Sequence, residues 1–328
     1  GVGVVIVLQL MRLAQCFGRG GTWGGGILMA YENVPENKRS FYAAIPQIGL
    51  PIGFGLSSIL IAVPTLLLPE DIFFTWGWRI PFLAAIILTV IVIRQKGEMM
   101  ETEDYKKAQA KLEAEEAEGK KHKVGFIPMV KGYWKTLLLG CGTRWVDGTF
   151  YNIFIVWILS YCINWLGMPL IQTYIITIIA CIFKIPFTLF GGWCAQKLGN
   201  TRTFVIGALA SAVLSIPTLK VIELSKGNLA ITIIGIVLGW SIAYNLIWAF
   251  ISSLWSSYFE TEVRYSGISF VYHVPSFLVA GMVPTICTLL INYGKGDTIY
   301  VGIYSTVVAL ISAACALALK ARHDRGEK

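Results

Sequence analysis

Hydrophobic residues along this chain gather into nine long runs that are separated by polar segments. The runs lie near residues 2–30, 41–68, 77–94, 136–163, 169–193, 203–222, 229–257, 266–292 and 298–320. Each exceeds the length of a β-strand and suits a helix that crosses a bilayer, which takes about 20 apolar residues. Because only helices and closed barrels satisfy their backbone polar groups in lipid, the pattern predicts an all-α integral membrane protein with nine transmembrane helices.

The composition excludes the main soluble classes of protein. Of the 328 residues, 55% are hydrophobic and 14% are charged, and the mean hydropathy is +0.66. A soluble domain carries roughly 25% charged residues. This deficit of charge argues against an ordinary cytosolic enzyme, a nucleic-acid-binding protein and a disordered chain.

The polar segment 95–135 divides the chain into two unequal parts. It mixes acidic and basic residues around a centre rich in Ala, Glu and Lys, which is typical of a solvated cytoplasmic linker; a regulatory docking site is the alternative. Residues 1–94 then hold three helices, and residues 136–328 hold six helices and a short tail. Six helices after such a linker suggest two six-helix halves. Since the chain opens at Gly1 inside an apolar run, we expect three helices of the first half to be missing.

The distribution of Lys and Arg predicts the orientation in the membrane. With residues 31–40 in the cytoplasm, nineteen of the 27 Lys and Arg residues fall on the cytoplasmic side and four on the other side. Positive residues favour cytoplasmic loops, so the C-terminus is expected in the cytoplasm. The net charge of +8 is therefore a topology signal rather than evidence for a nucleic-acid partner.

The cysteines and histidines give no sign of a metal or catalytic centre. The seven cysteines form no CxxC pair, and the three histidines are scattered along the chain. Cysteines in apolar runs behave as small hydrophobic residues. A membrane enzyme needs a catalytic constellation, and the sequence contains none that we recognise, so we expect neither an enzyme nor a cofactor. A channel is disfavoured because no charged ring or filter-like loop is visible.

Four motifs follow one another in a specific order. They are RLAQ at 12–15 leading into GGTWGG at 20–25, PQIG at 46–49, WGWRIPF at 76–82 and RYSG at 264–267. Together they resemble the metabolite:proton symporter family of the major facilitator superfamily, which includes transporters for proline and betaine, alpha-ketoglutarate, citrate and shikimate. The resemblance covers essentially the whole chain and matches helices four to twelve of a twelve-helix transporter. It implies the major facilitator fold, a bacterial-type inner membrane location and proton-coupled uptake of a small organic solute by a monomer.

Three departures from the family pattern fall at positions linked to coupling and gating. Thr22 stands where the family usually has Glu, and Arg19 stands where it has a small neutral residue. Gln196 replaces the Asp of an Asp-Arg pair in a cytoplasmic loop. These departures put the usual coupling carboxylate and the usual gating salt bridge in doubt.

Two arginines in the first helix are candidate substrate contacts. Arg12 and Arg19 lie two helical turns apart on one face, roughly 10 Å apart along the axis. Charges inside a span are costly and are therefore candidates for function. We hypothesise that Arg19 contacts an anionic substrate; pairing with a neighbouring helix is the alternative. Arg12 matches the family's Arg in this helix, and the resemblance implies a coupling or structural role for it.

A second pair of charges lies in the run 136–163. Arg144 and Asp147 are three residues apart and can pair on one helix face. Asp147 lies roughly 16 Å from the cytoplasmic start of its helix, near the middle of a core about 30 Å thick. With Thr22 in place of the family's Glu, Asp147 is the best candidate for the proton carrier. A permanently ionised structural partner of Arg144 is the alternative.

The charges within the spans favour an anionic substrate. Four cations, Arg12, Arg19, Arg144 and Lys184, stand against Asp147. An excess of positive charge in a low dielectric attracts anions. The sequence therefore favours a carboxylate over a zwitterionic osmolyte such as proline or betaine, and a non-transporting membrane sensor derived from this fold is a third alternative.

The remaining candidates are aromatic residues of the cavity and charged residues of the gate. Tyr151, Trp240 and Tyr244 are candidates for lining the substrate cavity, although ordinary packing is the commoner role of such residues. Four charged residues near the cytoplasmic helix ends are predicted to form the gate: Glu32, Arg39, Lys197 and Arg264. Arg264 lies 225 residues after Arg39 in a similar local sequence, as repeated transporter halves would place it.

Overall fold

The computed structural model describes residues 38–96 and 126–327, with a few scattered positions before residue 38. Throughout these ranges the chain forms helices joined by short turns, and they contain no β-strand. Eight of the helical segments are long and apolar enough to cross a membrane. The predicted fold class is therefore confirmed: the protein is an all-α, multi-pass membrane protein.

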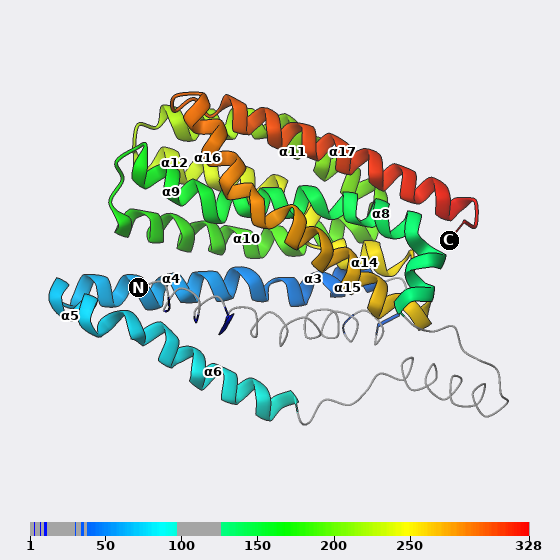
Figure 1. Ribbon diagram of the computed structural model, residues 1–328, viewed down its shortest axis with the longest axis horizontal. Helices are drawn as coiled ribbons and strands as arrows, with labels where there is room; N and C mark the ends of the chain where they lie inside the picture. Colours follow the sequence, from blue (N-terminus) through cyan, green and yellow to red (C-terminus); the bar gives the residue numbers. More distant parts are fainter. Residues whose placement is uncertain are drawn as a thin grey trace.

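The first two spans form a hairpin that carries the N-terminal part of the described chain (Figure 1). Helices α3 and α4 build the first span and meet at Ile48, and α6 builds the second. Their bounds and those of the short connecting helices are α3 Arg39–Gln47, α4 Gly49–Leu67, α5 Glu70–Thr75, η2 Gly77–Arg79 and α6 Ile80–Lys96.

Six further spans form a bundle from residue 126 to residue 324. Two of them contain a π-helical turn (η3 and η4), and one contains a 3₁₀ turn (η5). The bounds are α8 Phe126–Tyr151, η3 Asn152–Trp157, α9 Ile158–Asn164, α10 Leu170–Leu198, α11 Asn200–Leu224, α12 Leu229–Ile236, η4 Val237–Ala243, α13 Asn245–Trp248, α14 Ile251–Ser256, α15 Thr261–Leu278, η5 Ala280–Met282, α16 Val283–Tyr293 and α17 Ile299–Asp324.

The eight candidate spans coincide with eight of the nine predicted hydrophobic runs, and the run 2–30 lies outside the described residues. The main difference is at α8, which begins at Phe126, inside the expected linker 95–135. Tyr133 has non-helical angles (φ −115°, ψ 17°), so α8 bends there. The hydrophobic run marks only the part of this helix that follows the bend.

The N-terminal hairpin packs on the six-helix bundle through α10. Figure 1 shows α3 and α4 running alongside α10. A Cβ at Gly192 of α10 would lie 2.6 Å from the Cβ of Ala44 in α3, and one at Gly55 of α4 would lie 3.4 Å from the Cβ of Cys181. Small residues let membrane helices approach closely, so these two glycines hold the hairpin against the bundle.

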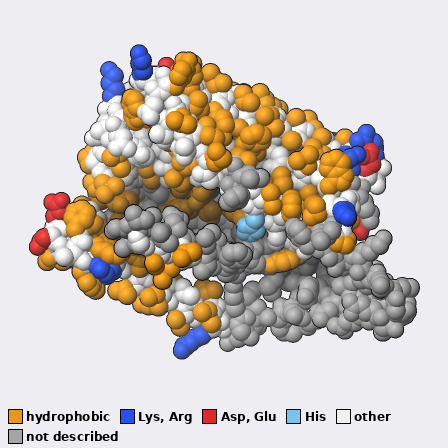
Figure 2. Space-filling model, in the orientation of Figure 1, with side chains coloured by type: hydrophobic (Ala, Val, Ile, Leu, Met, Phe, Trp, Pro, Cys, Tyr) orange, Lys and Arg blue, Asp and Glu red, His pale blue; other side chains and the backbone are white. Residues whose placement is uncertain are grey.

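Charged side chains lie toward the ends of the helices, and hydrophobic ones cover the middle (Figure 2). At one end, Lys220 Nζ pairs with Glu223 (3.0 Å) and with Asp297 (2.7 Å). Glu223 Oε2 also accepts hydrogen bonds from the Thr298 N–H and hydroxyl. The hydrogen bond from Lys220 and one from the Ile299 N–H hold the pKa of Asp297 below its usual value. These contacts tie the end of α11 to the start of α17.

Close packing inside the bundle predicts opposite effects for two Gly→Ala substitutions. A Cβ at Gly207 of α11 would lie 2.5 Å from the backbone oxygen of Leu246, whereas one at Gly132 of α8 meets nothing within 4 Å. Gly207→Ala should lower the free energy of unfolding by about 1–3 kcal/mol, because backbone cannot move aside cheaply. Gly132→Ala should raise it by up to about 1 kcal/mol through helix propensity. Denaturant titration of helicity in mixed micelles measures both; equal effects would contradict this packing.

Candidate functional site

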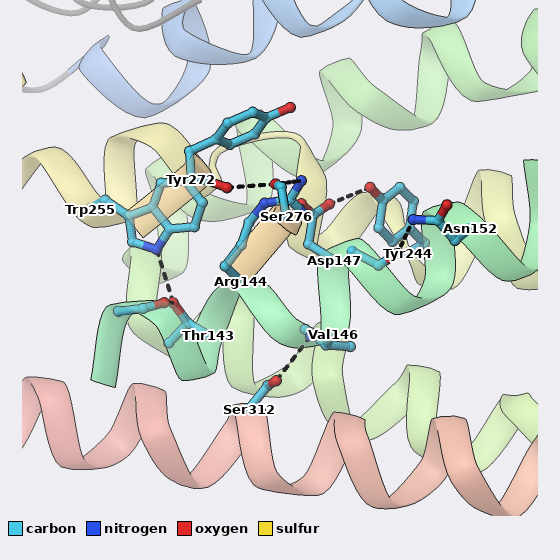
Figure 3. Close-up of polar contacts among 12 residues, drawn as sticks. Thr143, Arg144, Val146, Asp147, Asn152, Tyr244, Trp255, Tyr272, Ser276 and Ser312 are labelled. Atoms are coloured by element: carbon cyan, nitrogen blue, oxygen red, sulfur yellow. Dashed lines mark hydrogen bonds and ion pairs between the residues drawn. The ribbon is translucent and has the colours of Figure 1, made fainter. Parts of the chain in front are cut away.

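The centre of the bundle contains an ion pair on α8. Arg144 Nη1 pairs with Asp147 Oδ2 one helical turn further along, and their side chains are 8% and 1% exposed. Figure 3 shows both side chains on the same face of α8. A lone charge in this environment would be very costly, so each member of the pair needs the other.

Residues of α15 hold the arginine in place. Arg144 Nη2 donates to Ser276 Oγ (3.3 Å), and the guanidinium carbon lies 4.5 Å from the centre of the Tyr272 ring. Ser276 Oγ donates in turn to the Tyr272 carbonyl oxygen (2.6 Å). The guanidinium therefore contacts a carboxylate, a hydroxyl and an aromatic face.

Tyr244 supplies the second partner of the carboxylate. Its hydroxyl donates to Asp147 Oδ1 (Figure 3). Tyr244 directly follows the π-helix η4, and η3 begins at Asn152, five residues after Asp147. A Cβ at Gly239 of η4 would lie 2.3 Å from Phe154 of η3, so the two π-helices touch through a glycine. Such turns occur often at functional sites because they shift the direction of the residues that follow.

Neighbouring helices also fix the position of α8. Ser312 of α17 accepts from the Val146 N–H (3.1 Å) and donates to the Gly142 carbonyl oxygen (2.7 Å). On another side, Trp255 Nε1 of α14 donates to Thr143 Oγ1 (2.9 Å). Figure 3 shows the bonds to Val146 and Thr143 beside the ion pair. They restrain the helix that carries both charges.

Lys184 of α10 is fully buried close to the pair. Its Nζ donates to Asn245 Oδ1 (2.9 Å) and to the Trp240 carbonyl oxygen (3.4 Å). The same atom lies 4.4 Å from the centre of the Trp240 ring and 4.2 Å from that of Tyr244. None of the carboxylates that the structure describes pairs with Lys184. Tyr244 thus touches the lysine with its ring and Asp147 with its hydroxyl.

A cavity of about 500 Å³ separates the N-terminal hairpin from the bundle near this charge cluster. Tyr272, whose ring lies on Arg144, forms part of its wall. Gln47 and Trp248 also line it, and both are at most 3% exposed. Among the described residues, nothing accepts a hydrogen bond from Gln47 Nε2 or Trp248 Nε1. Among the described residues, the lining consists of Pro46, Gln47, Gly49, Leu50, Gly53, Phe54, Ser57, Trp248 and Tyr272.

The sequence-predicted cavity residues lie close to this space but do not line it. Tyr151 is half-buried, with its ring 5.9 Å from that of Phe54 in the cavity wall. Trp240 and Tyr244 are fully buried, and Tyr244 stacks on Trp248 with ring centres 6.3 Å apart. Tyr151 and Tyr244 therefore pack against residues of the wall, and Trp240 packs on Lys184. Arg12 and Arg19 lie outside the described residues.

The predicted gate residues separate into two groups. Arg39 and Arg264 line one small polar cavity at the end of the molecule where α3 begins, whereas Lys197 is exposed near the end of α10. Glu32 lies outside the described residues. Gln196, which replaces the family's Asp, accepts a hydrogen bond at Oε1 from the Phe41 N–H (3.2 Å). An amide therefore still links the hairpin to the bundle.

Sequence reasoning missed Gln47 as a cavity residue. The residue belongs to the PQIG motif at 46–49, so the motif drew attention to it but gave no chemical role. The sign that could have indicated it is a polar side chain, that of Gln47, within an otherwise apolar helical region. Only the cavity that α3, α13 and α15 line together shows that Gln47 and Trp248 share one space.

Comparison with known proteins identifies the family. The family model of the Major Facilitator Superfamily matches residues 2–280. The chain belongs to this superfamily. The predicted resemblance is thereby confirmed, and the superfamily relatives described next are transporters rather than enzymes.

Several superfamily proteins match over nearly the whole chain. The Shikimate transporter of Escherichia coli is 28% identical over 96% of this chain and 70% of its own length. The Inner membrane metabolite transport protein YhjE of the same organism is 29% identical, with 99% and 72% covered. The Proline/betaine transporter of Salmonella typhimurium is 26% identical, with 99% and 64% covered.

One solved structure supports the fold. The D-xylose-proton symporter has a TM-score of 0.61 and 16% sequence identity, covering 89% of this chain and 65% of that one. At this identity the likeness concerns the fold alone. The chain thus spans between three-fifths and three-quarters of the length of the proteins that it matches.

The geometry around Asp147 predicts the effect of removing one hydroxyl. Tyr244→Phe keeps the ring beside Lys184 and Trp248 but removes the donor to Asp147. The free energy of unfolding should fall by about 1–2 kcal/mol, because one lobe of a buried carboxylate loses its hydrogen bond. Tyr293→Phe is the matched control, since Tyr293 is 75% exposed, and it should have almost no effect. Denaturant titration in mixed micelles checks both variants, and equal stability of the two would contradict the assigned bond.

Proposed function

We propose that the protein is a proton-coupled symporter of a small organic carboxylate that works by alternating access. The observation that carries this proposal is the buried Arg144–Asp147 pair beside a cavity between the hairpin and the bundle. In this proposal the protein interacts with the solute, with protons and with the lipid bilayer. It acts as a monomer in a bacterial-type inner membrane, with its C-terminus in the cytoplasm.

Asp147 is the proton carrier in this proposal. While Asp147 is ionised, it neutralises Arg144. When Asp147 takes up a proton, the guanidinium loses its counter-ion in a low dielectric, where an unpaired charge is costly. A solute carboxylate that enters the cavity and passes Tyr272 then replaces the lost negative charge. Binding of the proton and binding of the anion therefore stabilise each other, which is the requirement for symport.

The charges of the described interior support an anionic solute. Arg144 and Lys184 stand against Asp147, so protonation of Asp147 leaves two cations near the cavity. Gln47 and Trp248, which line the cavity, each carry a buried N–H group without an acceptor among the described residues, and such donors suit carboxylate oxygens. One relative, the Shikimate transporter of Escherichia coli, is named for a solute of this class.

A zwitterionic osmolyte is the second candidate, because the cavity wall also contains two aromatic rings. Trp248 and Tyr272 can attract a quaternary ammonium through their ring faces. The Proline/betaine transporter of Salmonella typhimurium is the relative that supports this reading. Ligand binding without flux would instead favour the sensor alternative, in which Thr22 and Gln196 have replaced coupling residues.

Alternating access then consists of movement of α3 and α4 against α10. The hydrogen bond from the Phe41 N–H to Gln196 and the Gly192–Ala44 contact hold this end of the interface closed. The gate proposed for Arg39, Lys197 and Arg264 lies at the same end. When the interface opens at this end, the central cavity is accessible from one side of the membrane. When it closes, the cavity becomes accessible from the other side.

Substitution of Asp147 tests the coupling. In proteoliposomes, unmodified protein should accumulate solute against its gradient when an inward proton gradient is imposed. Asp147→Asn should abolish accumulation but retain solute exchange across equal concentrations, because the amide mimics the protonated carboxyl. Asp71→Asn, at an exposed position in α5, should behave like the unmodified protein. Proton-driven accumulation that survives in Asp147→Asn would show that Asp147 is only a structural partner of Arg144.

Substitution of Trp248 tests the cavity and the solute class. Trp248→Phe keeps an aromatic ring but removes the N–H, so the KM for a carboxylate should rise about ten-fold, corresponding to one lost hydrogen bond to a charged group. Trp193→Phe, at a position of α10 that is 50% exposed, should leave KM unchanged. If the solute is a quaternary ammonium compound, Trp248→Phe should change KM little and Trp248→Leu should raise it strongly.

A further inference from the structure

An apolar groove of about 590 Å³ runs along α8 between α15 and α17. None of the side chains in its described lining carries a charge, a hydroxyl or an amide. Leu137 and Pro275 are buried at its floor, whereas Trp134, Leu138 and Ile311 are 55%, 65% and 38% exposed along its open side. In a chain that spans a membrane, an open groove of this composition suits hydrocarbon rather than water.

The length of the groove matches the depth of one lipid leaflet. Trp134 and Trp145 both line it, and they lie eleven residues apart on the part of α8 that follows the bend at Tyr133. This spacing corresponds to about 16 Å along the helix axis. Half of a hydrocarbon core about 30 Å thick is about 15 Å. The groove is therefore as long as the region that one acyl chain occupies.

Positive charge lies at the Trp134 end of the groove. Lys135 Nζ lies 5.5 Å from the centre of the Trp134 ring, and Lys131 is exposed four residues earlier. None of the carboxylates that the structure describes pairs with either lysine. Tryptophan and lysine together are typical of the headgroup level of a membrane, where ammonium groups attract anionic lipids. The end of the groove thus complements a negatively charged headgroup.

The groove adjoins the helical turns that hold the buried ion pair. Pro275 lines it, and the next residue of α15, Ser276, accepts the hydrogen bond from Arg144 Nη2 (3.3 Å). On α8, Trp145 lines it and directly follows Arg144. A molecule that fills the groove therefore packs on α8 and α15 at the height of the Arg144 contacts.

We propose that this groove binds one acyl chain of an anionic phospholipid, with the phosphate of the headgroup at Lys135. The chain fills the space between α8, α15 and α17, and the phosphate contacts the ammonium group. Because the lipid binds the packed helices, it stabilises the contact of α15 with α8. The groove shares no lining residue with the central cavity, so the site does not depend on which solute is carried.

Photolabelling of the whole chain in mixed micelles tests this site. The probe is phosphatidylglycerol with a diazirine on one acyl chain, and mass spectrometry of peptides locates the adducts. Unlabelled phosphatidylglycerol or phosphatidylcholine with the same acyl chains is the competitor. We expect adducts concentrated in residues 134–145, 270–279 and 311–315, and removal of the label by phosphatidylglycerol at an at least five-fold lower concentration than by phosphatidylcholine.

Two pairs of variants separate the headgroup contact from the acyl-chain contact. Lys135→Gln should raise the phosphatidylglycerol concentration for half-competition about five-fold, whereas Lys226→Gln, at an exposed lysine between α11 and α12, should not change it. Leu138→Gln should lower the labelling yield, because it places an amide on the open side of the groove. Leu289→Gln in α16 is the matched control, since Leu289 is 64% exposed and lies outside the groove.

Three results would each overturn the proposal. The first is labelling of the exposed helix α6 at the same density as the groove, and the second is equal competition by the two lipids. The third is the absence of adducts in the groove, as expected if another segment of the chain fills it. If Lys135→Gln does not fold, Lys135→Arg keeps the positive charge and should retain the preference for phosphatidylglycerol; loss of that preference in folded Lys135→Arg also contradicts the charge contact.

Discussion

The burial of the Arg144–Asp147 pair is the constraint on which the arrangement of the bundle depends. Two opposite charges in a membrane interior are stable only when their remaining hydrogen-bonding capacity is also met. Here Tyr244 of the α12–α14 span donates to the carboxylate and Ser276 of α15 accepts from the guanidinium, while Arg144 Nε meets no acceptor among the described residues. The α12–α14 span and α15 must therefore both pack against α8 at the height of the ion pair. Gly148 permits this approach, because a Cβ there would lie 3.0 Å from that of Ala280 in η5. The π-helices η3 and η4 contribute to the same arrangement, since they change the direction of the side chains that follow them beside the ion pair.

Lys184 extends this constraint to α10. Its ammonium group meets two oxygen acceptors and two aromatic faces, and Asn245 is held by the Lys184 and Ser241 carbonyl oxygens at 3.1 and 2.7 Å. Tyr244 belongs to both environments, so a change in the charge of Asp147 acts on a ring that also contacts the lysine. The site is consequently one electrostatic unit distributed over four spans, and its members cannot be assigned independent energies.

Much of this organisation follows from sequence, and the reasons are physical. Hydrophobic length fixes the spans, because lipid forces each run to form a helix, and the spacing of Arg144 and Asp147 places them on one helix face. The partners of the pair could not be predicted in this way. Tyr244 and Ser276 lie 97 and 132 residues away, and local periodicity says nothing of contacts over such distances. The π-turn before Tyr244 also shifts the helical phase, so a regular helix drawn through residue 240 would point Tyr244 in the wrong direction. The early start of α8 was not predicted because Lys131, Gly132 and Lys135 separate the short apolar stretch at 126–130 from the hydrophobic run 136–163.

Helix α3 connects the two cavities, which makes their behaviour interdependent. Arg39 lines the cavity at one end of this nine-residue helix and Gln47 lines the central cavity at the other. The two ends are about 12 Å apart, at 1.5 Å per residue. Between them, the Phe41–Gln196 hydrogen bond and the Ala44–Gly192 contact fasten α3 to α10. A short helix held at its centre transmits a displacement at one end to the other as a rigid body. If the proposed gate at the Arg39 end favours one position of α3, it biases the position of Gln47 at the central cavity, and by reciprocity the solute biases the gate. This linkage follows from the shared helix, whichever solute the central cavity accepts.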